Sequence, residues 1–278
     1  MKLKGLNIVV TGANQGLGLE MAGAFLREGA SVAICARDAG KLAGAVKILG
    51  AIKGGGSLTA KPLDVSDEAA VRAYAAETIS AFKRVHVLVN NAGVYGPKGP
   101  TEEVDSAEWV KAAQINLFGV FYVCKYFIPH LKASGGGRII NLSGGGATNP
   151  LPMISAYAAS KAAVVRLTET LALELRPFNI FVNAMAPGAL NTRLLDEVLE
   201  AGPGKVGKEF YAKAVKQKET GGAPLIKGAE LAVYLASPES GELTGKLISA
   251  VWDPWREFAK HKDELSGSDI YTLRRIVP

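Results

Sequence analysis

A tyrosine and a lysine four residues apart are the side chains of this sequence best suited to proton transfer. Tyr157 and Lys161 stand in the segment SAYAASK, at the start of a stretch with a helical pattern. Four-residue spacing places both side chains on one face of a helix. A free tyrosine has a pKa of about 10 and is a poor base at neutral pH, but a neighbouring ammonium stabilises the phenolate and lowers that pKa. The pair can therefore act as general acid or base on a ketone–alcohol couple.

A glycine-rich turn near the N-terminus has the composition of a phosphate-binding loop. The apolar run Asn7–Thr11 leads into TGANQGLG, residues 11–18, and a helical pattern follows. Glycines let the backbone approach a pyrophosphate, and a helix N-terminus offers free N–H groups. The strand–turn–helix context makes the motif specific, although the spacing T-G-x-x-x-G-x-G differs from G-x-G-x-x-G. The residues predicted to bind a dinucleotide here are Gly12, Asn14, Gln15, Gly16, Leu17 and Gly18.

The end of the second apolar run predicts which dinucleotide binds. The segment Cys35-Ala36-Arg37-Asp38 follows the glycines by about 20 residues, where the adenosine ribose lies in such folds. An acidic residue there binds the 2′-hydroxyl of NAD, whereas an arginine offers a fork for the 2′-phosphate of NADP. Arg37 therefore favours NADP(H), and Asp38 keeps NAD(H) possible if the turn shifts by one residue.

Composition excludes several other classes of protein. Apolar residues make up 48% of the 278 residues and charged ones 21%, as in globular proteins. The longest nearly apolar run, Ile115–Cys124, is too short for a membrane helix. The net charge of +6 comes without a cluster of basic and aromatic residues, so we expect no nucleic-acid partner. The two cysteines and three histidines lack metal-ligand spacing, so no metal site is predicted; with no secretory signal, we expect a cytoplasmic protein.

The elements that must position these residues alternate along the chain. Seven β-branched apolar runs predict strands at Asn7–Thr11, Ala30–Cys35, Ser57–Leu63, Val85–Val89, Arg138–Leu142, Asn179–Ala184 and Lys246–Val251. Amphipathic stretches predict helices at Gly16–Glu28, Lys41–Ile52, Asp67–Phe82, Ser106–Lys132, Ala156–Leu175 and Lys227–Ala236. Such alternation is typical of an α/β fold with a parallel sheet covered on both faces. We predict one domain over residues 1–251 and a C-terminal extension over residues 252–278.

Together these motifs resemble the short-chain dehydrogenase/reductase family, in its short single-domain branch. The matching pieces fall in the family's order and cover about residues 5–250: residues 11–18, Leu63-Asp64-Val65, Asn90-Asn91-Ala92-Gly93, Asn116, the strand Arg138–Ser143, Tyr157 with Lys161, and Pro187-Gly188 with Thr192. The resemblance implies a doubly wound, Rossmann-like sheet of seven parallel strands, in agreement with the seven apolar runs.

The resemblance also implies which residues hold the cofactor. Asp64, beside Val65, would hydrogen-bond the adenine amino group. Asn90 would line the adenosine side of the cleft, in a turn with Ala92 and Gly93 that holds the central sheet together. The residues expected around the nicotinamide and phosphates are Pro187, Gly188 and Thr192.

Four residues carry the catalytic roles that the resemblance implies. Tyr157 would donate or accept the proton. Lys161 would bind the nicotinamide ribose hydroxyls and lower the pKa of Tyr157. Asn116 would open the backbone of a long helix so that a water joins Lys161 to solvent. Ser143 is our candidate for the donor that orients the substrate.

The assignment of Ser143 rests on a departure from the family pattern. The family places its orienting serine about thirteen residues before the tyrosine, where this sequence has Gly144. Ser143 lies one residue early, in Asn141-Leu142-Ser143-Gly144-Gly145-Gly146. The triple glycine could rotate Ser143 into place, another donor such as Thr148 could serve, or Ser143 could have only a backbone role.

These residues predict an NAD(P)(H)-dependent oxidoreductase, NADP(H) preferred, acting on a secondary alcohol or carbonyl substrate. An alternative is a nucleotide-sugar epimerase or dehydratase with bound cofactor, although such relatives usually carry a separate C-terminal substrate domain. A non-catalytic dinucleotide-binding sensor is a second alternative, against which the Tyr157, Lys161 and Asn116 set argues. The resemblance further suggests a homotetramer, or a homodimer, built on the helices Ser106–Lys132 and Ala156–Leu175.

Two segments fall outside the regular alternation. The first is the glycine- and lysine-rich stretch Asn191–Gly222. Its part Pro203–Lys218 carries five lysines and one acid, which suggests either a lid that favours an anionic substrate or a solvated helix face. In the extension, Trp252 and Trp255 offer large apolar surfaces that are costly to leave in water. We therefore expect the two tryptophans to anchor the extension near the mouth of the active site, against this chain or a neighbouring subunit.

Overall fold

Each of the seven predicted strands is present within residues 1–276, which is the part of the chain that the computed structural model describes. The strands are β1 (Asn7–Thr11), β2 (Ser31–Ala36), β3 (Leu58–Pro62), β4 (Val87–Asn90), β5 (Gly137–Leu142), β6 (Ile180–Ala186) and β7 (Leu247–Ser249). They pair in parallel in the order β3-β2-β1-β4-β5-β6-β7. The parallel sheet predicted from the apolar runs, and the doubly wound seven-stranded order that the family resemblance implies, are both confirmed.

The sheet changes its winding direction between β1 and β4. From β1 the chain adds β2 and β3 on one side, then returns to place β4 on the other, with Val9 beside Leu88. In open α/β sheets, ligands bind at the carboxyl ends of the strands at such a switch point. The glycine turn after β1 and the Asn90–Gly93 turn after β4 lie at this edge.

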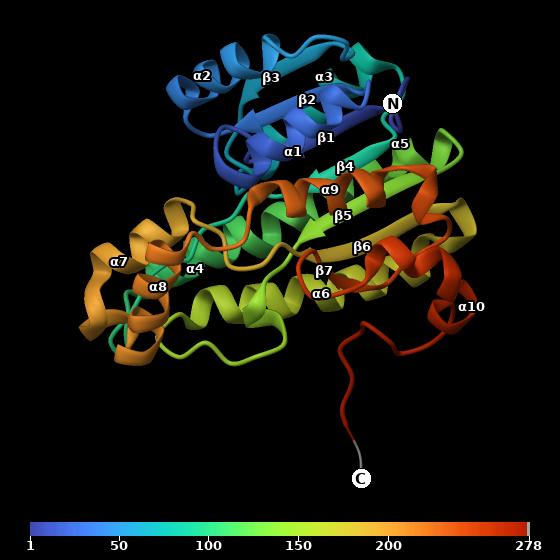
Figure 1. Ribbon diagram of the computed structural model, residues 1–278. Coiled ribbons are helices and arrows are strands. Elements are labelled where there is room, and N and C mark those ends of the chain that lie inside the picture. The colour runs from blue at the N-terminus through green and yellow to red at the C-terminus, as the bar shows by residue number, and fades with distance from the viewer. Residues whose placement is uncertain (277–278) are drawn as a thin grey trace.

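Helices cover both faces of the sheet (Figure 1). One face carries α1 (Gly16–Arg27), α2 (Ala39–Gly50) and α9 (Leu225–Ala236). The other carries α3 (Glu68–Phe82), α5 (Gly119–Ala133) and α6 (Ser155–Leu175). The predicted long helix Ser106–Lys132 divides into α4 (Ser106–Ala113), a π-helical turn at Gln114–Phe118, and α5. Within residues 1–276, every helix is too short or too polar to span a membrane.

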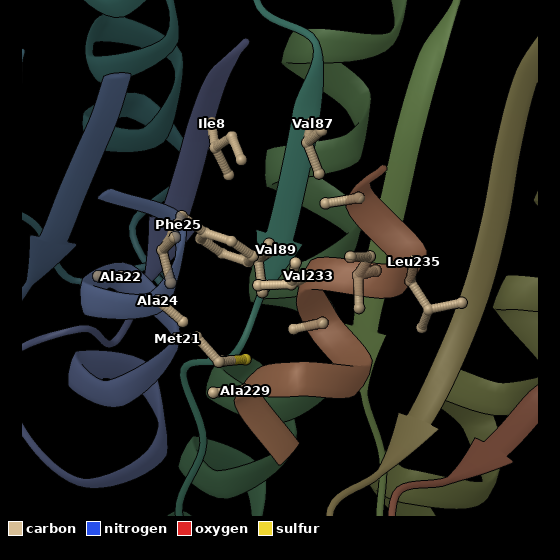
Figure 2. Close-up of a cluster of buried hydrophobic side chains, with 14 of the residues drawn as sticks. Ile8, Met21, Ala22, Ala24, Phe25, Val87, Val89, Ala229, Val233 and Leu235 are labelled. Carbon is tan, nitrogen blue, oxygen red and sulfur yellow. The ribbon is translucent and has the colours of Figure 1, made fainter. Parts of the chain in front are cut away.

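The strands are apolar on both sides because each face has its own core. Figure 2 shows Met21 and Phe25 of α1 meeting Ala229 and Val233 of α9 over Val89 of β4. On the opposite face, Phe127 of α5 and Val164 of α6 are fully buried. Burial on both faces fixes the sheet rigidly, so that the loops at its carboxyl edge have a stable base.

Two helices fold from the stretch that lay outside the alternation: α7 (Arg193–Val206), kinked at Gly202, and α8 (Lys208–Thr220). Their buried faces pack together through Leu195, Val198 and Ala214. All the lysines of residues 203–218 are exposed, and Lys218 pairs with Asp196 at 2.7 Å. The exposed lysines agree with a solvated helix face, and the lid for an anionic substrate stays a prediction.

The extension packs back on the body of the protein. It forms a 3₁₀ helix at Trp255–His261 and the short helix α10 (Lys262–Leu265). Trp255 is buried in the main core against Tyr234, with ring centroids 5.4 Å apart, whereas Trp252 is 84% exposed. Trp255 therefore anchors the extension to this chain, as predicted, whereas Trp252 does not. A contact of Trp252 with a neighbouring subunit, and a position near the mouth of the active site, stay predictions.

Candidate active site

The glycine turn fits tightly against the turn that follows β4. A Cβ atom on Gly12 would lie 2.7 Å from the Cα of Ala92, and one on Gly18 would lie 2.4 Å from the carbonyl oxygen of Gly12. The amide of Asn91 donates to the carbonyls of Thr11 and Gly12, at 2.9 Å each. Glycine is therefore required at both positions by contact within the protein, besides the freedom it leaves for a phosphate.

A cavity of ≈ 600 Å³ opens at this edge of the sheet and collects most of the predicted residues. Its lining includes Gly12, Asn14, Gln15, Gly16, Leu17, Gly18, Arg37, Asp64, Val65, Ala92, Gly93, Ser143, Tyr157, Lys161, Pro187 and Thr192. Asn90, Asn116 and Gly188, which were also predicted, are not part of the lining. Long-range folding thus joins the glycine turn and the tyrosine–lysine pair in one cavity.

Three charged residues line the cavity at the end of β2 and the start of α2. The carboxylate of Asp38 caps α2, accepting a hydrogen bond of 2.9 Å from the backbone N–H of Lys41. Arg37 and Lys41 are exposed and line the same cavity, and their side chains make no hydrogen bond or ion pair among the described residues. Two free cations next to a helix N-terminus form a good environment for a phosphate. Lys41 was missed in the sequence, although it lies one helical turn after Arg37.

Asp64 lies in the cavity wall directly after β3. Its carboxylate accepts hydrogen bonds from the backbone N–H and the hydroxyl of Ser66, at 2.9 and 2.6 Å. Burial alone would raise the pKa of Asp64, but Ser66 and the ammonium of Lys111 outweigh it and lower the pKa below its usual range. The carboxylate is therefore fixed in its charged form, able only to accept hydrogen bonds.

Asn91, rather than Asn90, lines the cleft, whereas Asn90 connects neighbouring strands of the sheet. Asn90 is buried, and its amide donates to the side chain of Asn141 in β5 at 2.8 Å. Asn91 lines the cavity and joins β4 to the glycine turn. Asn90 thus lies beneath the cleft rather than along its surface, because the pleat of β4 directs successive side chains to opposite sides. The sequence places both in one motif but does not say which of them faces the cleft.

Tyr157 and Lys161 lie on one face of α6, as their spacing predicts. The ammonium of Lys161 lies 5.6 Å from the centroid of the Tyr157 ring and donates to the carbonyl oxygen of Leu142 at 2.7 Å. Burial lowers the pKa of Lys161 to about 8. Burial and the neighbouring Tyr95 raise the pKa of Tyr157 above its usual range. Burial of the phenol therefore dominates in this structure, and the expected lowering of the pKa of Tyr157 by Lys161 stays a prediction.

Asn116 lies inside the π-helical turn between α4 and α5. Its side chain is fully buried, accepts from the backbone N–H of Val94 and donates to the carbonyl of Val94, both at 2.9 Å. A Cβ atom on Gly93 would lie 3.3 Å from the Asn116 Oδ1 and 3.6 Å from the Lys161 Nζ. The absence of a side chain at Gly93 therefore leaves space between these two polar groups.

Of the two candidates for the orienting hydroxyl, only Ser143 already donates its proton within the protein. The hydroxyl of Ser143 donates to the backbone carbonyl of Lys161 at 3.3 Å, so it is used within the protein. Thr148 is exposed and accepts a hydrogen bond from Asn149. The position next to Tyr157 belongs to Gly144, whose Cβ, if present, would lie 2.7 Å from the phenolic oxygen. The geometry agrees with the alternative in which Ser143 has a backbone role.

The segment after β6 closes the cavity from the other side. Pro187 and Thr192 line it, and Thr192 faces Gly16, whose Cβ would lie 3.4 Å from the threonine methyl group. Gly188 has a φ of +93° and packs against Val251, so it shapes the segment without lining the cavity. No group of three or more potential metal ligands comes together within residues 1–276.

These observations define a Rossmann-like dinucleotide-binding protein with a proton-transfer pair in its cofactor cleft. The residues present fit a dinucleotide: a glycine cradle that side chains would fill, free cations near one end, and Tyr157 with Lys161 in the same cavity.

Comparison with known proteins agrees with this class. A family model described as short chain dehydrogenase matches residues 6–202. The chain is 37% identical to 3beta-hydroxysteroid dehydrogenase 1 of Eggerthella lenta over 88% of this chain and 92% of that protein. It is 32% identical to short chain dehydrogenase mpl6 of Monascus purpureus, over 97% of this chain and 88% of that protein. The solved structure of NAD+-bound xylitol dehydrogenase has a TM-score of 0.82 and 27% identity, covering 90% of this chain and 98% of that one.

The chain belongs to the short-chain dehydrogenase family. It is therefore an oxidoreductase that uses a nicotinamide dinucleotide to interconvert alcohol and carbonyl groups of small molecules.

Proposed function

We propose that this protein is an NADP(H)-preferring dehydrogenase/reductase of secondary alcohols and ketones, with Tyr157 as the proton carrier. The observation that carries the proposal is the single cavity lined by Arg37 and Lys41 as well as by Tyr157 and Lys161. When bound, the nicotinamide supplies or accepts the hydride. The chain's own residues hold the reactants and move the proton.

Tyr157 is suited to give its proton to a developing alkoxide. Because burial and Tyr95 raise its pKa, the phenol keeps its proton at neutral pH. A substrate oxygen within hydrogen-bond reach of the phenolic oxygen receives that proton as the carbonyl is reduced, and returns it in the reverse direction. Lys161, four residues on, would hold the ribose hydroxyls of a bound cofactor and keep a positive charge near the reacting oxygen.

The proton is replaced from solvent through Lys161 and Asn116. The space left by Gly93 lies between the Asn116 Oδ1 and the Lys161 Nζ. A water there has polar partners on both sides, which is the condition for an ordered buried water. The π-helical turn supports this route because it holds Asn116 inside the protein rather than on the helix surface.

The preference for NADP(H) rests on Arg37 and Lys41. The side chains of both cations are without partners within residues 1–276, whereas one oxygen of the Asp38 carboxylate already caps the N-terminus of α2. A 2′-phosphate would gain two charge-assisted contacts, and a 2′-hydroxyl would gain neither. To bind the ribose of NAD(H) while it caps α2, Asp38 would have to use its other carboxylate oxygen.

Titration of NADPH and NADH tests this preference. Arg37→Ala and Lys41→Ala should each raise the Kd of NADPH about tenfold or more, as expected for a lost charge-assisted hydrogen bond. The Kd of NADH should change little. Lys47→Ala, at the other end of α2 and outside the cavity lining, is the matched control. Equal losses for both cofactors, or tighter binding of NADH by the wild type, would show that Asp38 sets the specificity.

A panel of carbonyls and secondary alcohols, assayed with both cofactors, tests the reaction itself. The panel should contain a keto-steroid and a polyol, because relatives are named for such compounds. If the purified wild type binds the cofactor but converts no compound of the panel, the proposed activity is contradicted. The protein would then be a dinucleotide-binding protein without turnover.

We further propose that the protein is a homotetramer or homodimer associated through α4, α5 and α6. Val110, Phe118 and Phe121 are 43–50% exposed along α4, the π-helical turn and α5. Apolar side chains grouped on one surface commonly mark a contact with another subunit. Light scattering should find an oligomer for the wild type and a smaller species for Phe121→Asp. A monomeric wild type would contradict this association. The cytoplasmic location expected from the sequence stays a prediction.

A further inference from the structure

The end of the extension is held against the body of the protein by polar contacts. We call residues 268–274 the tail segment. The buried ammonium of Lys246 donates to the carbonyls of Ser268 and Ile270, at 2.7 and 3.0 Å. The backbone N–H of Leu247 in β7 donates to the carbonyl of Tyr271 at 2.8 Å. The tail segment is thus attached along the edge strand of the sheet.

Leu273 is held on both sides of its backbone by α6, the helix that carries Tyr157 and Lys161. Its N–H donates to the carboxylate of Glu169 at 2.7 Å, and its carbonyl accepts from Arg166 at 2.7 Å. Glu169 is buried and also accepts from Arg274 at 3.0 Å. A buried carboxylate satisfied by backbone and guanidinium groups fixes its partners strongly, so Leu273 has a defined position.

The side chain of Leu273 packs against a small apolar cluster formed by Ala147, Val165 and Ala184. Ala147 ends the glycine loop, as we call residues 144–147. The backbone N–H of Ala147 donates to the carbonyl of Gly144 at 3.0 Å. Gly144 in turn lies against the phenolic oxygen of Tyr157, where a Cβ would be 2.7 Å away. A continuous set of contacts therefore leads from Leu273 to Tyr157.

The glycine loop needs support from outside because its own residues provide little. Three consecutive glycines have the largest backbone freedom of any tripeptide. A Cβ on Gly145 would meet no atom within 4 Å, so nothing packs on that residue. The fixed end of the loop is formed by Gly146, where a Cβ would lie 3.0 Å from Ala158 and from Leu151, and by Ala147, which belongs to the cluster that Leu273 packs against.

We propose that the tail segment supports the glycine loop, and that Leu273 is a positioning residue for Tyr157. This inference rests on the proposed role of Tyr157 as proton carrier. Removal of the leucine side chain frees the loop, which then no longer holds the tyrosine hydroxyl at the substrate oxygen. Small displacements of a reacting group lower turnover, because catalysis requires a near-attack geometry.

Leu273→Ala tests the proposal, with Leu265→Ala as its matched control. Leu265 is a buried leucine of the same extension, but it packs in the main core, away from the glycine loop. Hydrogen–deuterium exchange of the Ala147 and Asn149 amides, which bond within the loop, should be several-fold faster in Leu273→Ala and unchanged in Leu265→Ala. With a substrate from the panel, kcat should fall about tenfold in Leu273→Ala while the Kd of NADPH stays constant. Leu273→Met, which nearly keeps the side-chain volume, should retain the wild-type exchange rates in the loop and the wild-type kcat.

A second variant tests the coupling through the loop. Gly145→Ala fits without contact and restricts the backbone, so the effect of Leu273→Ala on kcat should be smaller in the Gly145→Ala background. Unchanged exchange in the loop, or equal losses of kcat in Leu273→Ala and Leu265→Ala, would overturn the proposal. Faster exchange with unchanged kcat would overturn it too, because the loop would not position Tyr157. If the wild type turns over no substrate, the proposed function fails, and the exchange rates still decide whether the tail segment supports the loop.

Discussion

At the scale of single residues, the hydroxyl of Tyr157 is the group on which turnover depends. Tyr157→Phe keeps the ring and its edge-on contact with Tyr95, whose centroid is 4.7 Å away, but removes the proton. We expect kcat to fall by about 10²–10⁴, the usual contribution of general acid–base catalysis, with cofactor affinity nearly unchanged. Steady-state kinetics and NADPH titration provide the measurement. Tyr126→Phe, whose hydroxyl bonds Glu68 outside the cavity, is the control. A kcat within about threefold of the wild-type value would show that Tyr157 is not the proton carrier.

Lys161 makes the stability of the free protein depend on pH. Burial lowers its pKa from the ordinary 10.5 to about 8. Below pH 8 the folded protein keeps a buried ammonium, which costs on the order of 3 kcal/mol relative to the unfolded chain. Between pH 8 and 10.5 the unfolded chain binds more protons than the folded one, so the free energy of unfolding rises with pH and the cost disappears.

Chemical denaturation of wild type and Lys161→Met from pH 7 to 10.5 checks this prediction. The difference in the free energy of unfolding between the two proteins should shift in favour of the wild type as the pH rises. The difference isolates Lys161, because the tyrosines and cysteines titrate in both proteins. A difference that stays constant with pH would show that Lys161 has an ordinary pKa.

At the scale of elements, the glycine turn and the turn after β4 form one unit. Gly18→Ala places a Cβ 2.4 Å from the carbonyl oxygen of Gly12 and 2.5 Å from the amide nitrogen of Asn91. We expect this overpacking to destabilise the protein by about 1–3 kcal/mol. The substitution should also weaken the binding of both NADPH and NADH, because the glycine turn shifts. Thermal unfolding and titration with NADPH and NADH check both effects.

Gly44→Ala is the control for this effect, because it adds the same methyl group to a helix. Gly44 is exposed in the middle of α2, and a Cβ there meets no atom within 4 Å. Alanine should stabilise the protein by about 0.5–1 kcal/mol and leave cofactor binding unchanged. Similar effects at both positions would contradict a specific contact at Gly18.

At the scale of the whole molecule, the two cysteines report the integrity of the core on the face of the sheet that α3, α5 and α6 cover. Cys35 in β2 and Cys124 in α5 are buried free thiols, and burial raises the pKa of each to about 12. The reactive thiolate is therefore scarce as well as inaccessible. A thiol reagent at pH 8 should label neither cysteine in the native protein and both in denaturant. Rapid labelling of native protein would mean that one face of the sheet opens readily.

The sequence predicts most of the fold because its signals are local. Seven β-branched runs separated by amphipathic stretches suffice for a parallel sheet, and the boundaries of β1 and the start of α1 agree with the prediction to the residue. The glycine turn and the Tyr157–Lys161 pair are equally local, since a tight turn and a helical spacing can be read from adjacent residues. The break in the helix at Asn116, by contrast, came only from the family resemblance.

The tertiary structure alone decides how distant segments meet at the site. Strand register directs Asn91 rather than Asn90 into the cleft, and the packing of α6 turns the Ser143 hydroxyl toward a backbone carbonyl. Burial, which spacing cannot reveal, raises the pKa of Tyr157 where a neighbouring lysine was expected to lower it. The contact of Leu273 with the cluster at Ala147 joins residues more than a hundred positions apart. Such contacts depend on the summed geometry of every element between them, so no local pattern in the chain encodes them.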